Sequence, residues 1–317
     1  MHEVVTVGET MVLLTAPEHY GKLKQAPVLQ KQIGGAESNV MVALARLGHH
    51  TAWISRVGAD PFGEEIMYRL RGEGVDTRHV LVDAQHRTGM MLKQRQQGSD
   101  PHVFYYRQHS AASHLHPSDL PEKVIASARI LHVTGIMPAL SQSCRDTVFA
   151  AVGLAKQHGV KVSVDPNLRL KLWSIEEARP VLLELIRQAD YFFPGVEEAR
   201  LLLEEPDCAV DDLIARFLEM GAGRVIMKLG SEGSITADAA SASLVTGIQV
   251  TEVDSVGAGD GFCAGYLSGV LRGLPPQECA RRANIVGALA VTDPSDYGGY
   301  PTEEELNASL QRSKLTR

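Results

Sequence analysis

The spacing of apolar residues along the second half of the chain predicts a regular alternation of strands and helices. Short apolar runs predict buried strands at 130–133, 161–164, 191–193 and 225–228. Apolar residues at spacings of three and four predict helices at 143–158, 175–189 and from Val196. The glycines of the turn 230–233 predict a hairpin. Buried strands separated by amphipathic helices indicate a mostly parallel sheet with helices on both faces, the doubly wound α/β class.

Two stretches interrupt this rhythm, Thr10–Ile33 and Thr88–Arg107, in which apolar and polar residues alternate as in exposed antiparallel strands. Two interpretations fit: a pair of surface hairpins, or a small sheet that stands off the main domain as a lid. An aromatic-rich strand that ends in Arg107 beside a polar loop is unusual for plain surface, so we favour the lid. The chain is then expected to be one domain, 1–317, with a lid formed by about 10–33 and 88–107 inserted in it.

A double glycine lies between these two stretches. Gly34-Gly35 opens a predicted helix in which Leu44 and Leu47 share one face, and Gly48 ends it. Residues without side chains at the start of a helix leave room for a ligand to approach the backbone.

A glycine-rich run, Asp-Ser-Val-Gly-Ala-Gly-Asp-Gly at 254–261, leads directly into a predicted helix that ends near Gly273. Backbone N–H groups of such turns converge on anions, and the helix start adds the positive end of a dipole. Asp260 would place a carboxylate beside the bound anion. One alternative is a plain turn with a helix cap, and another is a G-x-G-x-x-A dinucleotide site that begins at Gly259. The second is weak because it lies late in the chain without an acidic partner downstream; a G-x-x-x-x-G-K-[ST] loop is absent from the sequence.

Composition narrows the classes of partner. The chain has 317 residues, of which 44% are hydrophobic, enough for one large core. Its 31 basic and 38 acidic residues give a net charge of −7 without a basic cluster, which argues against nucleic acid or an anionic membrane as the partner. Cys144, Cys208, Cys263 and Cys279 are far apart, so we expect reduced thiols. Because neither a signal peptide nor a membrane-spanning apolar run is recognisable, we expect a cytoplasmic protein.

Parallel sheets covered by helices bind ligands at the carboxyl ends of their strands. Polar residues that follow predicted strands or open the helix after the glycine run are Asp165, Asn167, Arg169, Glu198, Lys228 and Asp260. We therefore expect these side chains to meet at one edge of the sheet.

Two signatures, one early and one late, together resemble the ribokinase-like, or PfkB, carbohydrate kinases. They are Gly34-Gly35-Ala36-Glu37-Ser38-Asn39-Val40 with Leu44-Ala45-Arg46-Leu47-Gly48, and the glycine-rich run at 254–260. The resemblance covers essentially the whole chain and implies a ribokinase-like fold. It is strongest to the 2-keto-3-deoxygluconate kinases, through Phe104-Tyr105-Tyr106-Arg107 and the segment 165–173.

The resemblance implies an ATP-dependent kinase in which Asp260 is the base that faces the sugar hydroxyl. The amides of Gly257, Ala258 and Gly259 would hold the transferring phosphate. An ordinary aspartate has a pKa near ~4 and is a weak base. We therefore expect Asp260 mainly to orient the hydroxyl and to accept its proton late, while amides and Mg²⁺ stabilise the phosphoryl charge.

The resemblance also assigns the nucleotide and the metal. Residues expected to contact the nucleotide are Asn167, Lys228, Gly230, Gly233, Gly257, Gly259 and Asn284. Asp165 and Glu198 would organise Mg²⁺ through water, although Glu198 is otherwise an ordinary acid in a first helical turn. The family often carries Asn-x-x-Glu here, whereas this chain has Gly195 in place of the asparagine. A monovalent cation such as K⁺ beside the glycine-rich run stays an open possibility.

For the sugar, the resemblance points to Gly34, Gly35, Asn39, Tyr105, Arg107, Ile136, Arg169 and Asp296. Arg107 and Arg169 suit a carboxylate, which paired hydrogen bonds from guanidinium groups recognise well, and a neutral sugar would not require them. The alternative is two solvated arginines. Related kinases tend to carry a tyrosine where this chain has Met91, so one substrate contact is altered.

The leading expectation is phosphorylation of a sugar acid, converting 2-keto-3-deoxygluconate to 2-keto-3-deoxy-6-phosphogluconate. A neutral-sugar kinase of the fructokinase or ribokinase type is the alternative within the enzyme class. A catalytically silent sugar-binding regulator is disfavoured by the intact Asp260 and its glycines. We also expect a homo-oligomer.

Overall fold

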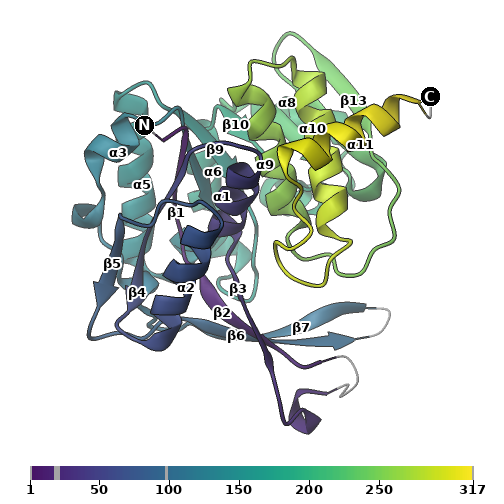
Figure 1. Ribbon diagram of the computed structural model, residues 1–317. Coiled ribbons are helices and arrows are strands. Elements are labelled where there is room, and N and C mark those ends of the chain that lie inside the picture. Colours follow the sequence, from purple (N-terminus) through teal and green to yellow (C-terminus); the bar gives the residue numbers. More distant parts are fainter. Residues whose placement is uncertain (1, 18–21, 97–98, 316–317) are drawn as a thin grey trace.

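The computed structural model describes residues 2–17, 22–96 and 99–315 and contains a large and a small sheet (Figure 1). The large sheet has, in spatial order, β13 (Ala242–Thr246), β12 (Gly233–Ala237), β11 (Val225–Lys228), β10 (Tyr191–Phe192), β9 (Lys161–Asp165), β8 (Ile130–Thr134), β1 (Val4–Val7), β4 (Thr51–Gly58) and β5 (Val80–Asp83). The strands from β11 to β5 are parallel, and β12 and β13 are antiparallel at one edge.

Helices cover both faces of this sheet because successive side chains of a strand point to opposite faces. Val4 and Trp53 lie in one buried cluster with α1 (Ala36–Arg46), α2 (Pro61–Gly72), α9 (Ala258–Leu271), α10 (Pro276–Ala290) and α11 (Glu303–Leu315). The next residues, Val5 and Ile54, lie in the other cluster with α3 (Glu122–Ala126), α4 (Ile136–Leu140), α5 (Gln142–Gln157), α6 (Ile175–Arg187), α7 (Val196–Leu203) and α8 (Val210–Glu219). Short 3₁₀ turns are η2 (Leu23–Gln25), η3 (Ala111–His114), η4 (Pro117–Asp119) and η5 (Gly230–Glu232).

The small sheet projects from this body in Figure 1 and has the order β3 (Gln30–Gly34), β2 (Met11–Thr15), β6 (Met90–Gln96), β7 (Ser99–Tyr106). Its central pair, β2 and β6, is parallel, so our expectation of antiparallel strands was wrong for this pair. The reason is that β2 follows β1 and β6 follows β5, and both leave the large sheet at its carboxyl edge. The side chains of Met11, Leu13 and Met91 form a buried cluster on the inner face of this sheet.

The predicted elements of the second half are confirmed with shifts of one or two residues at their ends. The helix expected at 143–158 is α5, and the turn at 230–233 is η5, which joins the antiparallel pair β11 and β12. The predicted lid segments become the four strands of the small sheet, while their residues 18–21 and 97–98 lie outside the described residues. A helix with the length and apolar character needed to cross a membrane was not found in the described part of the chain.

Candidate active site

A cavity of about 480 Å³ lies between the carboxyl edge of the large sheet and the inner face of the small sheet. All six polar residues expected at this edge line it, namely Asp165, Asn167, Arg169, Glu198, Lys228 and Asp260. Residues expected from the resemblance also line it, namely Gly35, Asn39, Tyr105, Arg107, Ile136, Gly257, Gly259 and Asp296. Residues that follow the parallel strands meet here because the carboxyl ends of such strands share one edge of the sheet. The small sheet, α1 and the loop after α10 add residues that lie as far apart in the sequence as Met11 and Asp296.

Helix α9 begins at this cavity, and Gly257 shapes its start. The residue has a φ of 83°, in the left-handed region that favours glycine. A Cβ at Gly257 would lie 2.1 Å from the main-chain oxygen of Asp296, so a side chain has no room. The Tyr300 hydroxyl donates a hydrogen bond of 2.8 Å to the Gly257 carbonyl and fixes the turn further. The first N–H groups of α9, which have no partner within the helix, can therefore serve an anion at the cavity.

Asp260, in the first turn of α9, is buried, with 8% of its surface exposed. Asn39 Nδ2 donates to Asp260 Oδ2 at 2.9 Å, and Asn167 Nδ2 lies 3.5 Å from Oδ1. Burial raises the pKa of Asp260 to about 7, and the charge of Asp165 adds to this rise, although the Asn39 hydrogen bond and Arg169 oppose it. This pKa differs from the ordinary value of about 4 expected from the sequence, because the sequence does not show how far the side chain is shielded from water. A carboxylate with a pKa near neutrality is a better proton acceptor at physiological pH.

Lys228 lies between the two carboxylates expected to organise a metal. Its Nζ is 3.0 Å from Asp165 Oδ1 and 3.9 Å from Glu198 Oε2. Burial alone would lower the pKa of Lys228, but the charges of Asp165 and Glu198 raise it above its usual value, so the ammonium stays charged. Direct coordination of Mg²⁺ by Asp165 would compete with this ammonium. A contact through water from Glu198 is compatible with the geometry.

The backbone holds Glu198 in place. Its Oε1 accepts the N–H of Leu168 at 2.8 Å, and its Oε2 accepts the N–H of Gly195 at 2.9 Å. The replacement of the family's asparagine by Gly195 therefore leaves the carboxylate anchored to the start of α7 and to the loop after β9.

On the side of the small sheet, Gly34 lies against the carboxylate of Asp296. A Cβ at Gly34 would lie 2.1 Å from Asp296 Oδ2 and 2.9 Å from Met91 Cε. Burial raises the pKa of Asp296 to about 6 against the lowering effect of Lys93. The absence of a side chain at Gly34 thus allows strand β3 to pack directly against the loop that carries Asp296.

The two arginines expected to bind a carboxylate differ in their surroundings. Arg107 is buried, and its Nε and Nη2 lie 2.7 and 2.6 Å from Glu9 Oε2. Arg107 lines the cavity as expected, but its charge is paired with Glu9, so fewer of its N–H groups remain for a ligand. Arg169 is exposed, lines the cavity and has no side-chain partner among the described residues. Only Arg169 thus has its full hydrogen-bonding capacity available for a ligand.

Sequence reasoning missed three buried charged residues around the cavity. Glu9 also accepts the Ser110 hydroxyl at 2.5 Å, so it holds both Arg107 and the loop after β7. Glu37 is fully buried in the first turn of α1, and burial raises its pKa to about 7 although Thr134 donates to its Oε1 at 2.5 Å. An acidic residue that directly follows Gly8 at the end of β1 was the available signal for Glu9.

Lys93 is the third of these residues. Its side chain is 2% exposed, and its Nζ lies 2.7 Å from Asp254 Oδ2 and 3.7 Å from Asp296 Oδ1. The signal was the alternation along 88–107, which places Lys93 on the same face as Met91 and opposite Val103. A lysine on the inward face of a strand calls for a carboxylate partner.

A second cavity of about 390 Å³ adjoins the start of α9 on the other side of Lys228. Predicted nucleotide contacts line it, namely Lys228, Gly230, Gly233, Gly259 and Asn284, together with Ala258. The Asn284 amide is already used, because Oδ1 accepts the Ser234 hydroxyl at 2.9 Å and Nδ2 donates to Val245 at 2.9 Å. Asn284 therefore joins α10 to β12 and β13, and its contribution to a ligand is one of shape.

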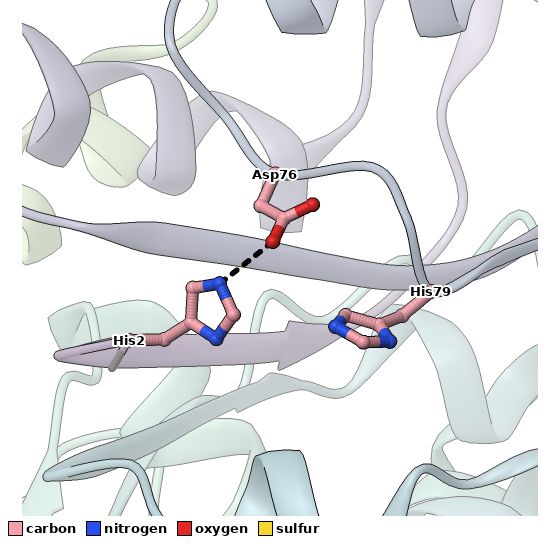
Figure 2. Close-up of side chains that lie close together, drawn as sticks. All are labelled: His2, Asp76 and His79. Atoms are coloured by element: carbon pink, nitrogen blue, oxygen red, sulfur yellow. Dashed lines mark hydrogen bonds and ion pairs between the residues drawn. The ribbon is translucent and has the colours of Figure 1, made fainter.

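Away from both cavities, one group of side chains among the described residues has metal-ligand spacing: the ligand atoms of His2, Asp76 and His79 all lie within 4.8 Å of one another (Figure 2). His2 Nε2 lies 2.8 Å from Asp76 Oδ2. The Arg78 guanidinium also binds Asp76, with Nη2 2.6 Å from Oδ2, and it is the main cause that holds the pKa of Asp76 below its usual range. The group lies at the amino end of β1, opposite the cavities. The positive charge of Arg78 already pairs with its one carboxylate, Asp76.

Comparison with proteins of known function adds independent information. The model of the pfkB family of carbohydrate kinases matches residues 1–303. The 2-dehydro-3-deoxygluconokinase of Bacillus subtilis (strain 168) is 40% identical over 316 residues, covering 98% of this chain and 96% of the relative. The enzyme of the same name from Thermoproteus tenax is 30% identical over 98% of this chain and 95% of the relative. Fructokinase-1 of Oryza sativa subsp. japonica is 31% identical over 96% of both chains.

Solved structures agree on the fold. A PfkB protein from Polaromonas sp. JS666 aligns with a TM-score of 0.89 and 38% identity over 97% of this chain and all of the other. An E. coli protein provisionally named Ribokinase II, solved with ATP and Mg²⁺, aligns with a TM-score of 0.91 and 29% identity over 98% of this chain and all of the other. A fructokinase double mutant from Vibrio cholerae O395, in its fructose-, ADP- and potassium-bound form, aligns with a TM-score of 0.84 and 29% identity over 97% and 98% of the two chains. With the ribokinase-like fold, a family match over most of its length and a buried aspartate at a glycine-lined helix start, the chain belongs to the pfkB family of carbohydrate kinases.

Proposed function

We propose that this carbohydrate kinase transfers the terminal phosphoryl group of ATP to a hydroxyl of a sugar acid, with 2-keto-3-deoxygluconate as the substrate and Asp260 as the base. The observation that carries the proposal is the buried Asp260, whose pKa of about 7 and position at the start of α9 suit proton acceptance beside an anion. Asn39 orients the carboxylate from α1 by its hydrogen bond of 2.9 Å.

The division of labour follows from the two cavities. The sugar would occupy the cavity under the small sheet, and the nucleotide the one lined by Gly230 and Gly233, so that the transferring phosphate lies at the start of α9 between them. The N–H groups of Gly257, Ala258 and Gly259 would stabilise its charge, and Lys228 would face its outer oxygens. Mg²⁺, when bound, neutralises phosphate charge, and Glu198 would hold it through water.

The proposed sugar-acid substrate rests on Arg169 and on the relatives. Arg169 has no side-chain partner among the described residues and lines the sugar cavity, so a substrate carboxylate would complete its hydrogen bonds. The relative with 40% identity is a 2-dehydro-3-deoxygluconokinase, which acts on the same sugar acid under its systematic name.

A neutral-sugar kinase is the second candidate, and one observation favours it. Arg107 is already paired with Glu9, so among the described residues that line the cavity one arginine, Arg169, is left without a side-chain partner. A fructokinase also stands among the relatives at 31% identity.

The deciding experiment compares wild type with Arg169→Gln in a coupled ADP assay on 2-keto-3-deoxygluconate, gluconate, fructose and ribose. A charge-assisted contact is worth about 1.5–3 kcal/mol, so kcat/KM for the preferred acid should fall by about 10- to 150-fold, while neutral sugars change little. Arg187→Gln is the matched control, because Arg187 is exposed on α6 far from the cavity and pairs with Glu184. A wild-type preference for fructose or ribose, or an equal loss on acidic and neutral sugars, would establish the neutral-sugar kinase instead.

Further parts of the proposal concern setting. The four cysteines are free thiols, which suits a reducing compartment such as the cytoplasm. The small sheet would act as a lid over the sugar, and assembly into a homo-oligomer stays a prediction.

A further inference from the structure

Lys93 belongs to the small sheet, but its side-chain ammonium contacts carboxylates of the main domain. It extends from β6 of the small sheet to Asp254 and Asp296, in the segments before and after the helix pair α9 and α10. All three side chains are at least nine-tenths buried, with exposed fractions of 2%, 7% and 4%. A buried ammonium beside two buried carboxylates implies that the three charges depend on one another.

These carboxylates lie next to the anion-binding turn. Asp254 Oδ1 accepts the N–H of Val256 at 3.1 Å, directly before Gly257. The main-chain oxygen of Asp296 is the atom closest to the missing Cβ of Gly257, at 2.1 Å. Lys93 thus contacts the start of α9 through two residues: Asp254, which precedes the turn, and Asp296, which packs against Gly257. A shift of the Lys93 ammonium would therefore move the turn that carries the phosphate-binding amides.

Asp254 and Asp296 are two carboxylates beside the glycine-rich run, and carboxylate oxygens could also hold an added monovalent cation. The Vibrio fructokinase that shares this fold was solved with a potassium ion. In this chain Lys93 Nζ, itself a monovalent cation, already lies 2.7 Å from Asp254. We propose that the Lys93 ammonium serves as a built-in monovalent cation, which holds the phosphate-binding turn and couples it to the lid, so that the enzyme works without added K⁺. The proposal rests on the anion-binding role given above to Gly257, Ala258 and Gly259.

Lys93 would be a positioning residue, because it acts on the turn and not on the reacting atoms. The test measures initial rates in a buffer whose bulk cation is tetramethylammonium, at a constant ionic strength of about 0.1 M, with and without K⁺ or NH₄⁺. Four proteins are compared: wild type, Lys93→Met, Lys93→Ala and Lys31→Met. Lys31 lies on β3 of the same small sheet, but its side chain is 46% exposed and pairs with Glu65, so it is a matched control.

We expect the wild-type rate to be the same with and without K⁺. Lys93→Met and Lys93→Ala should lose about 10- to 100-fold, mainly in kcat, because a misplaced turn weakens a transition-state contact. NH₄⁺ or K⁺ should restore part of the rate of Lys93→Ala, whereas Lys31→Met should match wild type. A wild type that K⁺ activates several-fold, or a Lys93→Met enzyme that keeps wild-type kcat without K⁺, would overturn the proposal.

The cation response of wild type needs no variant, so a misfolded Lys93 variant still leaves the proposal testable. Failure of the proposed function would be seen differently, as an absence of ADP release with every sugar acid. In that case the thermal midpoint with ADP decides, since K⁺ that binds the folded state must raise Tm. A Tm that is independent of K⁺ supports the built-in cation, and a Tm that rises with K⁺ refutes it.

Discussion

Replacing Asp260 by asparagine should change two properties in opposite directions, lowering turnover and raising stability. Asparagine keeps the shape of the side chain, and its oxygen can still accept the hydrogen bond from Asn39. Its amide nitrogen replaces the oxygen that faces Asn167 Nδ2 at 3.5 Å. If the Asn167 amide turns over, this nitrogen can donate to Asn167 Oδ1, which is buried without a hydrogen-bond partner. Because the proton acceptor is lost, kcat should fall by about 10²-fold or more, with ATP binding largely retained.

The gain in stability follows from the raised pKa. Burial raises the pKa of Asp260 from 3.8 to about 7, so the folded protein binds this proton more tightly than the unfolded chain does. Below pH 3.8 Asp260 is protonated in both states and its ionisation has no effect on stability. As the pH rises from 3.8 to about 7, the free energy of unfolding falls progressively, and above pH 7 the whole loss is present. A shift of this size corresponds to about 4 kcal/mol as an upper limit. Asparagine is neutral at every pH and avoids this cost.

The assay is thermal unfolding of wild type and Asp260→Asn at about pH 5 and about pH 8. The variant should be more stable at both, and its advantage should be larger at the higher pH by about 1–3 kcal/mol, which is several degrees in Tm. Asp207→Asn is the control, because Asp207 is exposed in the loop before α8. An Asp260→Asn protein with wild-type kcat, or with the same Tm difference at both pH values, would refute the reasoning.

Two further predictions concern the start of α9 and the small sheet. Gly257→Ala should abolish most activity, because alanine disfavours a φ of 83° and its Cβ would clash with Asp296. The control is Gly153→Ala on the exposed side of α5, where a Cβ meets nothing within 4 Å; this variant should keep activity and gain about 0.5–1 kcal/mol in the free energy of unfolding. An active Gly257→Ala enzyme would contradict the tight fit at Gly257. Saturating sugar should increase hydrogen-exchange protection of the amides in β6 and β7, as expected for a lid; protection that is unchanged with bound sugar would make this sheet a static wall of the cavity.

Much of the fold was predictable because it depends on patterns of residues that are close together in the sequence. The apolar runs of the parallel strands and the glycines at the start of α9 each depend on neighbours in sequence, and both were confirmed. The strand-end rule then placed Asp165, Lys228 and Asp260 together without any distance being known.

The charge states around the cavity were not predictable in the same way. The pKa of Asp260 depends on how much water reaches it, and the neutralisation of Arg107 depends on Glu9, which is 98 residues away in the sequence. Likewise, the parallel pairing of β2 with β6 follows from where both strands leave the large sheet, which requires the order of strands in space.

The separation of the site into two sheets has a consequence for how such enzymes diversify. Met11, Leu13 and Met91 form a small apolar cluster of their own, apart from the two large clusters of the main domain. A substitution at Met91 or at the neighbouring Tyr105 therefore changes the wall of the cavity under the small sheet without disturbing the packing around Asp260 and the start of α9. If the sugar binds under the small sheet as proposed, its identity can change through substitutions in that sheet while the residues at the start of α9 stay the same.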